Sequence, residues 1–324
     1  MMGASQSRAG EMDTPGRTQA ARLSHRFAGL TILLGLALTA LASVAGLPPT
    51  AQYLPLALSV VILGLPHGAV DHLVIPRARG ERVNRRSMAA VGLLYLLVGT
   101  AYAAVWFLTP VAAFAFFILL TLAHWGQGDV YALRELTGVT YLESTAARVG
   151  ALLVRGGLPM LIPLIAFPRQ YEAVAIAFGG LIVLTLARGF LRSADDRGPW
   201  LIDTAETLGL VGYFSLVPPI LAIGLYFPLW HSLRHILRTI LLEPTARETL
   251  SEGETKAAFG QFAREATPLT LGALVVLGGV GLAVPQTPAT VPDVLGLYLV
   301  TIAVLTLPHV VVVSILDAEQ GIWA

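Results

Sequence analysis

The run "VLGLYLVTIAVLTLPHVVVVSIL", Val294–Leu316, contains no Asp, Glu, Lys or Arg. A transmembrane helix needs about 20 consecutive, mostly apolar residues, so this run by itself predicts one membrane span. Pro308 and His309 interrupt it. Proline removes a backbone donor, and an ionisable side chain inside a bilayer is costly, so His309 is a candidate for a functional role.

The rest of the chain has the same apolar character. Of its 324 residues, 55% are hydrophobic and 13% are charged, against about 25% charged in soluble domains. Three more long runs lack charged side chains: Phe27–Leu47, Ser87–Thr109 and Ala266–Pro292. The composition therefore predicts an all-α, polytopic integral membrane protein. The absence of cysteine excludes disulfides, thiolate metal ligands and a cysteine nucleophile.

Hydropathy divides the chain into about ten apolar segments. A polar tail, residues 1–26, is expected to be disordered, residues 27–317 to form the transmembrane domain, and residues 318–324 a short tail. The predicted segments are Phe27–Leu47, Gln52–Ile75, Ser87–Leu108, Pro110–Leu133, Thr145–Phe167, Ala173–Phe190, Leu201–Val217, Ile220–Leu242, Thr267–Val284 and Val294–Leu316.

Charged side chains concentrate in every second connection between these segments. The connection Arg77–Arg86 carries five arginines against Glu81, and Glu243–Glu265 is another charged loop. The intervening connections are short, proline-rich and nearly neutral. Because positive loops stay on the cytoplasmic side, we expect a multi-pass protein of the cell (inner) membrane with both termini in the cytoplasm.

Six of the seven histidines fall inside the predicted spans, all on segments that run from the outer face inward. Five lie 11 to 16 residues from the assumed outer ends, a slab roughly 7–8 Å thick at the rise of an α-helix. Any one of them could be a histidine hydrogen-bonded between helices, but a shared depth indicates a common site. The six are His67, His72, His124, His231, His235 and His309.

The spacing of two histidines indicates a metal site. In "WHSLRH" His231 and His235 are four residues apart, so both project from one face of an α-helix and could bind one ion. A set of imidazoles without thiolates suits Fe, Cu, Zn or Ni. The HExxH motif of zinc metalloproteases does not occur.

Carboxylates accompany the histidines in two motifs. In "GLPHGAVDH", His67 and Asp71 share a helix face, so Asp71 is predicted to orient a metal-binding histidine by a hydrogen bond. His72 points elsewhere and is predicted to support the site rather than bind metal. In "HWGQGD", Asp129 could serve another histidine as Asp71 does.

Other polar and aromatic side chains in the spans allow two interpretations. Arg155 could extend its charge to the cytoplasmic headgroups, which is the favoured interpretation, or bind a carboxylate such as Asp129. Aromatic residues near the histidines could line a pocket for a long apolar ligand, although packing is the commoner role of such residues. The candidates for the pocket are Trp125, Tyr131, Trp230 and Phe227.

Four motifs carry a resemblance to a known family. "GLPHGAVDH" at Gly64–His72, "HWGQGD" at His124–Asp129, "WHSLRH" at Trp230–His235 and "LPHVVVV" at Leu307–Val313 occur in the family's order and span nearly all of the membrane part. They resemble the Brp/Blh membrane proteins, which are β-carotene dioxygenases associated with microbial rhodopsins.

The resemblance implies an iron(II) site and cleavage of the central double bond of β-carotene by O₂ to two molecules of all-trans-retinal. The family's ligands would fall on His67, His124, His231 and His235, while His309 is a further ligand or a pocket residue. Iron held only by imidazoles keeps positions open for O₂, and an apolar polyene would reach the site from the lipid. No catalytic residue beyond the metal ligands is expected, and a microbial rhodopsin is a possible partner that receives the retinal.

Two alternatives stand beside this interpretation. Membrane desaturases and hydroxylases also use histidine-bound iron, but they carry adjacent histidine pairs, and this chain has no HH dipeptide. A haem-binding or transport protein without enzymatic activity would need only some of these histidines. Nothing in the sequence suggests nucleic acid as a partner.

Overall fold

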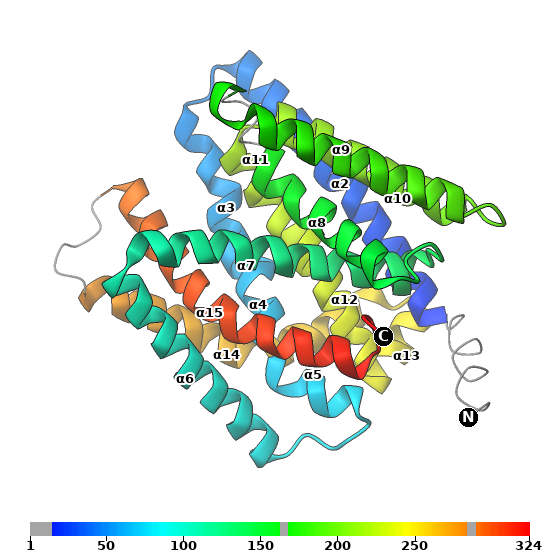
Figure 1. Cartoon of the computed structure of the whole chain (residues 1–324). Coiled ribbons are helices and arrows are strands. Elements are labelled where there is room, and N and C mark those ends of the chain that lie inside the picture. The colour runs from blue at the N-terminus through cyan, green and yellow to red at the C-terminus, as the bar shows by residue number, and fades with distance from the viewer. Residues whose placement is uncertain (1–14, 163–167, 284–289) are drawn as a thin grey trace. The chain divides into compact units, whose positions relative to one another are not determined.

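The computed structural model describes residues 15–162, 168–283 and 290–324. Throughout these ranges the chain forms helices and connecting turns, without a strand (Figure 1). The described part of each predicted apolar segment is helical, so the predicted all-α class is confirmed. The ends of two segments, residues 163–167 and 284, lie outside the described residues. Within the described ranges, six helical stretches are long and apolar enough to cross a membrane: Pro15–Ala45, Thr50–Ala78, Arg85–Leu108, Pro110–Thr137, Ala175–Arg192 and Gly296–Glu319.

Large apolar side chains on these helices face outward, as expected for helices that contact lipid. Phe107 is 86% exposed, Val111 83% and Leu33 68%. A soluble monomer rarely exposes apolar side chains so extensively. The protein is therefore a helical membrane protein.

The predicted tails differ from the structure at both ends. The first helix, α2 (Pro15–Ala45), begins well before Phe27. Of the predicted tail, residues 1–14 lie outside the described residues, and residues 15–26 belong to α2, where small residues at four-residue spacing are buried: Gly16, Ala20 and Ser24. The last helix, α15 (Val291–Glu319), extends past residue 317.

The chain divides into two compact units. Unit 1 comprises the described residues up to Gly64, Leu122–Phe262 and Ile322–Ala324, and unit 2 comprises Leu65–Thr121 and the described residues of Ala263–Gly321. Helix α7 (Pro110–Tyr131) and helix α14 (Thr255–Ala283) each contribute residues to both.

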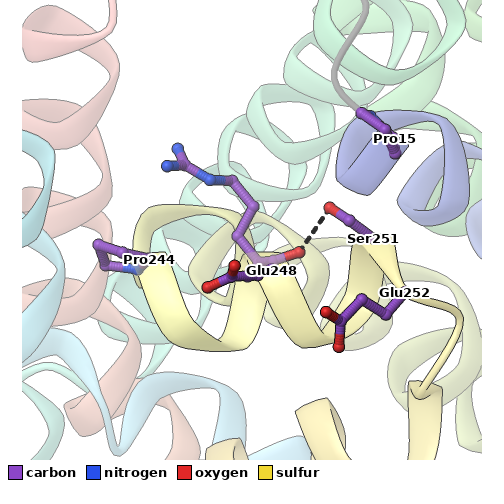
Figure 2. Close-up of a pocket in the computed structure, with 6 residues that line it drawn as sticks. Pro15, Pro244, Glu248, Ser251 and Glu252 are labelled. Atoms are coloured by element: carbon purple, nitrogen blue, oxygen red, sulfur yellow. Dashed lines mark hydrogen bonds between the residues drawn. The ribbon is translucent and has the colours of Figure 1, made fainter.

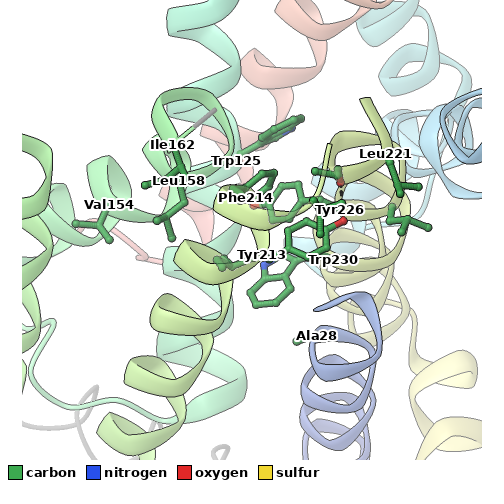
Figure 3. Packing of buried hydrophobic residues seen from close by; sticks show 14 of the residues in the cluster. Ala28, Trp125, Val154, Leu158, Ile162, Tyr213, Phe214, Leu221, Tyr226 and Trp230 are labelled. Carbon is green, nitrogen blue, oxygen red and sulfur yellow. Dashed lines mark hydrogen bonds between the residues drawn. The ribbon is translucent and has the colours of Figure 1, made fainter. Parts of the chain in front are cut away.

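Unit 1 packs around an aromatic and aliphatic core. Trp125, Tyr213, Phe214, Tyr226 and Trp230 form its centre (Figure 3). The Tyr213 hydroxyl donates to the Ala222 carbonyl (2.8 Å), which satisfies its one polar atom. The other helical segments of unit 1 are η1 (Pro49–Gln52), α3 (Tyr53–Ser59), η2 (Val60–Gly64), η3 (Ala132–Thr137), α8 (Thr145–Leu161), α9 (Pro168–Arg192), α10 (Gly198–Leu216), α11 (Pro219–Tyr226), η5 (Phe227–Ser232), α12 (Leu233–Leu242) and α13 (Pro244–Ser251).

A hollow of about 550 Å³ lies on the surface of unit 1, where the start of α2 meets α13 (Figure 2). Arg247, Glu248 and Glu252 are among the residues that line it, and the Ser251 hydroxyl donates to the Arg247 carbonyl (2.8 Å). The C-terminal residues also join unit 1, because Arg148 donates to the carbonyl oxygens of Trp323 (3.1 Å) and Ala324 (2.9 Å).

Unit 2 is built on capped helices. Asn84 caps α6 (Arg85–Leu108), and Thr290 caps α15, each in a capping box that satisfies backbone donors at the helix start. The Tyr102 hydroxyl of α6 donates to the Ala113 carbonyl of α7 (2.9 Å). The unit also contains the short helices α4 (Leu65–Gly68) and α5 (Asp71–Ala78).

Helices lose their regular form close to the candidate histidines. The π-helical segment η2 ends at Gly64, two residues before Pro66, and the π-helical segment η5 contains Pro228, whereas α15 continues as an α-helix through Pro308. Proline cannot donate the i→i−4 hydrogen bond and its ring collides with that carbonyl. The chain widens into π-helical turns near Pro66 and at Pro228, and such turns frequently occur at functional sites.

Candidate metal centre

In unit 1 the structure brings two predicted ligands together. Nε2 of His124 lies 3.2 Å from Nε2 of His231, and the two buried rings meet edge to face at 72°. Two nitrogens bound to one ion at about 2.1 Å lie about 3.0–3.4 Å apart. The observed spacing matches a shared ion, and an N–H···N hydrogen bond between neutral imidazoles has the same geometry.

A close helix crossing holds His124 in place. A Cβ atom on Gly126 would collide with the Leu152 carbonyl oxygen, and one on Gly156 would collide with the Leu122 carbonyl oxygen. Only glycine lets the backbones of α7 and α8 approach so closely, as small residues do at membrane helix interfaces. His124 lies between residues 122 and 126 and is therefore anchored by this contact.

Asp129 supports the segment that carries His231. Its carboxylate accepts hydrogen bonds from the Trp230 indole (3.1 and 3.2 Å) and from Arg234 (2.8 Å). Trp230 immediately precedes His231 in η5. Asp129, predicted to help a histidine directly, thus acts on a neighbour of His231 in the described contacts and joins α7 to η5.

Two arginines and three carboxylates form a buried network that includes Asp129. The arginines are Arg155 and Arg234, and the other carboxylates are Asp203 and Glu206. Arg155 is 1% exposed and lies 2.7 Å from Asp203, 3.0 Å from Glu206 and 3.5 Å from Asp129. The favoured interpretation, that Arg155 extends to the headgroups, is wrong. The alternative, that Arg155 binds a carboxylate such as Asp129, is confirmed, because the buried guanidinium forms an ion pair with Asp129. Removing a carboxylate partner from a buried guanidinium would be costly.

Arg234 completes the network. Its Nε donates to Ser24 (3.1 Å), Nη1 to Asp129 and Nη2 to Glu206 (2.7 Å). Three carboxylates face two guanidiniums, and His25 Nδ1 lies 3.0 Å from Glu206. The sequence reasoning did not identify Arg234, although an arginine inside an otherwise apolar span was a visible signal.

Tyr141, which lies outside the spans, is hydrogen-bonded to the same network. The Tyr141 hydroxyl donates to Asp203. Burial, reinforced by the nearby Asp203 carboxylate, raises the pKa of the Tyr141 phenol far above its ordinary value. The phenol therefore stays protonated and remains a hydrogen-bond donor.

The four aromatic residues predicted to line a pocket divide into two kinds. Trp125 and Phe227 lie against His231, with ring centroids 5.8 and 6.1 Å away, and Phe227 is stacked on it. Trp230 instead lies under Arg234, 4.4 Å from its guanidinium carbon, and Tyr131 lies 4.2 Å from that of Arg238.

Unit 2 contains a second group of buried polar side chains. The rings of His67 and His309 meet edge to face with centroids 4.9 Å apart. His309 Nδ1 lies 2.7 Å from the Asp71 carboxylate, which also accepts a hydrogen bond from the Tyr95 hydroxyl (2.6 Å). Gly68 lies beside His309, because a Cβ atom there would be 3.4 Å from its Nδ1.

The partner of Asp71 differs from the one that helical phase predicted. Phase placed Asp71 beside His67, but a turn at Ala69 and Val70 separates α4 from α5, so the segment is not one regular helix. Asp71 consequently bonds to His309 on α15. Tyr95 was missed because it lies on α6, and no local spacing connects it to Asp71.

The remaining two histidines differ in burial. His235 is buried on α12, whereas His231 belongs to the wider turn of η5, so their four-residue spacing does not follow one regular α-helix. His72 on α5 is partly exposed, and its supporting role stays a prediction.

The donors present in each unit fit a metal that prefers nitrogen ligands. The imidazoles of His124 and His231 converge at ligand spacing, and His309 is paired with a carboxylate as metal-binding histidines commonly are. No thiolate exists in the chain. Such donors suit iron, copper, zinc or nickel.

Comparisons with known proteins identify the family of the chain. The β-carotene 15,15'-dioxygenase family model matches residues 58–181 and 172–317. The chain is 40% identical, over 95% of its length and 97% of the relative's, to a probable β-carotene 15,15'-dioxygenase Blh of Halobacterium salinarum. It is 30% identical to the probable dioxygenase Brp of the same organism, over 82% of this chain and 84% of that one.

A more distant relative is the β-carotene 15,15'-dioxygenase of an uncultured marine bacterium, 24% identical over 54% of this chain and 65% of the relative. No solved structure matches the chain. With matches over most of its length to both the family model and the Halobacterium proteins, the chain belongs to the β-carotene 15,15'-dioxygenase family of enzymes.

Proposed function

We propose that this protein is a membrane iron enzyme that cleaves the central double bond of β-carotene with O₂ and releases two molecules of all-trans-retinal. The observation that carries the proposal is the pair of buried imidazoles, His124 and His231, with nitrogens 3.2 Å apart in a helical membrane protein. Family membership supplies the substrate class and the position of cleavage.

The proposed ligands of Fe²⁺ are His67, His124, His231 and His235. This set rests on the sequence motifs, and the geometry of unit 1 supports two of its members, His124 and His231. Iron, when bound, would supply activation of O₂. The rest of the chemistry is positioning, because a conjugated hydrocarbon offers no proton for a base to remove.

The protein's own residues would exclude water and place the polyene. Trp125 and Phe227 contact His231 and give it an apolar, aromatic neighbourhood. In unit 2 a groove of about 590 Å³ between α6, α7 and α15 is lined almost wholly by apolar side chains. Such surfaces suit a substrate that arrives from the lipid rather than from water.

The location of the protein follows the same reasoning. We place it in the cell membrane with the charged connections and both termini in the cytoplasm, in accordance with the positive-inside rule. Retinal is apolar and would leave into the membrane, where a microbial rhodopsin could receive it.

The test is expression in a bacterial host that accumulates β-carotene, with β-carotene and retinal measured by chromatography. The wild-type chain should bleach the cells and yield retinal, and His124→Ala should abolish both effects. Thr121→Ala is the matched control, one turn earlier on α7, because the Thr121 hydroxyl bonds to the Phe117 carbonyl of its own helix. Orange cells without retinal, from membranes that hold folded, iron-loaded protein, would refute the proposal.

The same preparation separates the alternatives. A haem protein would show a Soret band after purification, and a transporter would move its solute without converting β-carotene. A desaturase or hydroxylase would leave the carbon skeleton intact, so its product would keep the full length of the carotenoid.

A further inference from the structure

Tyr95, Asp71 and His309 form a hydrogen-bonded chain in unit 2. Asp71 is 1% exposed and His309 is 4% exposed. One carboxylate oxygen, Oδ2, receives both the Tyr95 hydroxyl at 2.6 Å and the Nδ1 of His309 at 2.7 Å. The rings of His309 and His67, one of the proposed ligands, meet edge to face.

This arrangement determines which nitrogen of His309 can bind a cation. A carboxylate accepts hydrogen bonds, so the proton of a neutral imidazole resides on Nδ1, next to Asp71. The lone pair then belongs to Nε2. Carboxylates commonly hold metal-binding histidines in this way. They fix the tautomer and the ring orientation, and they make the imidazole a stronger electron-pair donor to the metal.

The Tyr95 hydroxyl fixes the carboxylate in turn. It comes from α6, whereas Asp71 comes from α5 and His309 from α15. Three helices therefore converge on one oxygen atom. An isolated structural histidine would be satisfied by the carboxylate alone, and the added tyrosine restricts the orientation of the group as a whole.

We propose that His309 is a further metal ligand that binds through Nε2, and that Asp71 and Tyr95 are positioning residues that present it. The inference rests on the proposed metal centre and adds a ligand to it. It assigns a role to a histidine that the sequence left between ligand and pocket residue.

The test is titration of the purified, metal-free protein with Co²⁺, followed through the visible absorption of the bound ion. His309→Ala should weaken binding by at least about 100-fold, and Asp71→Asn by about 10- to 100-fold, the usual effect of losing a histidine's carboxylate partner. Tyr95→Phe should weaken it by several-fold. At saturating Co²⁺, His309→Ala should also change the positions and intensities of the bands.

Tyr102→Phe is the matched control. Tyr102 lies on the same helix, α6, and is buried, but its hydroxyl donates to the Ala113 carbonyl. The substitution removes the same hydroxyl group and should leave the affinity and the spectrum unchanged. If His309→Ala does not fold, the Co²⁺ affinity of Tyr95→Phe tests the inference instead. This substitution removes a single oxygen atom and disturbs the packing least.

The opposite result is well defined. If His309→Ala and Tyr95→Phe lower the melting temperature but bind Co²⁺ with wild-type affinity and spectrum, His309 is a structural residue and the inference is wrong. The readout does not involve β-carotene. Failure to make retinal, with Co²⁺ binding that still depends on His309, would instead refute the proposed function alone.

Discussion

In unit 2 a buried carboxylate touches a histidine directly, with Asp71 2.7 Å from His309 Nδ1, whereas in unit 1 the carboxylate of Asp129 bonds to Trp230, the residue before His231. Asp71 receives a neutral tyrosine as its second partner. Asp129 instead lies between two guanidiniums. The same residue type is thus used in two ways.

The difference has an electrostatic cause. A buried carboxylate with neutral partners keeps its negative charge available to an imidazole and, through it, to a metal. One paired with arginines is largely neutralised, and it contributes mainly by joining helices. We therefore expect substitutions in unit 2 to change metal binding, and substitutions around Asp129 to change stability.

The largest effect is expected at the histidine pair. His231→Ala removes one of two imidazoles 3.2 Å apart, so retinal formation should fall below detection and the iron content of the purified protein should fall with it. Metal analysis and the chromatographic assay measure the two quantities. Retention of full iron and activity would remove His231 from the ligand set.

The next effect is expected at Arg234, which bonds to Ser24, Asp129 and Glu206. Arg234→Met leaves two buried carboxylates without their main cation, and breaking a buried ion pair costs about 3–5 kcal/mol. Unfolding of the detergent-solubilised protein measures the loss. A change below about 1 kcal/mol would show that the network is not buried as a unit.

A smaller effect on stability is expected for Asp129→Asn. The amide can still accept from the Trp230 indole but no longer offsets Arg155 and Arg234, which predicts a loss of about 1–3 kcal/mol. Metal affinity should change less than in Asp71→Asn. If Asp129→Asn lowers the metal affinity more than Asp71→Asn does, the distinction between the two units is wrong.

The smallest effect is expected at the surface of unit 2. Arg79 lies 2.6 Å from Glu319, but its side chain is 45% exposed. Exposed ion pairs contribute little because water and salt screen them. Arg79→Ala should leave the melting temperature and retinal yield unchanged, and a marked loss of either would mean that this contact is shielded in the native membrane.

Part of the site was predictable because it depends on local composition. An uncharged run shows a span at once, and six histidines inside such runs indicate a site before any contact is known. Local composition could not decide the role of Arg155. Its partners Asp203 and Glu206 lie about fifty residues further along the chain, and only folding shows whether the guanidinium finds them or the headgroups.

The sequence by itself determined the helical membrane class, the set of candidate histidines and the family, because hydrophobic length, charge placement and short motifs can be read along the chain. The tertiary structure alone decided which side chains meet. Pairing depends on helix phase and on packing between distant segments, and the turn at Ala69–Val70 and the π-helical segment η5 both alter that phase. For this reason Asp71 bonds to His309, and Asp129 to Trp230 and Arg234.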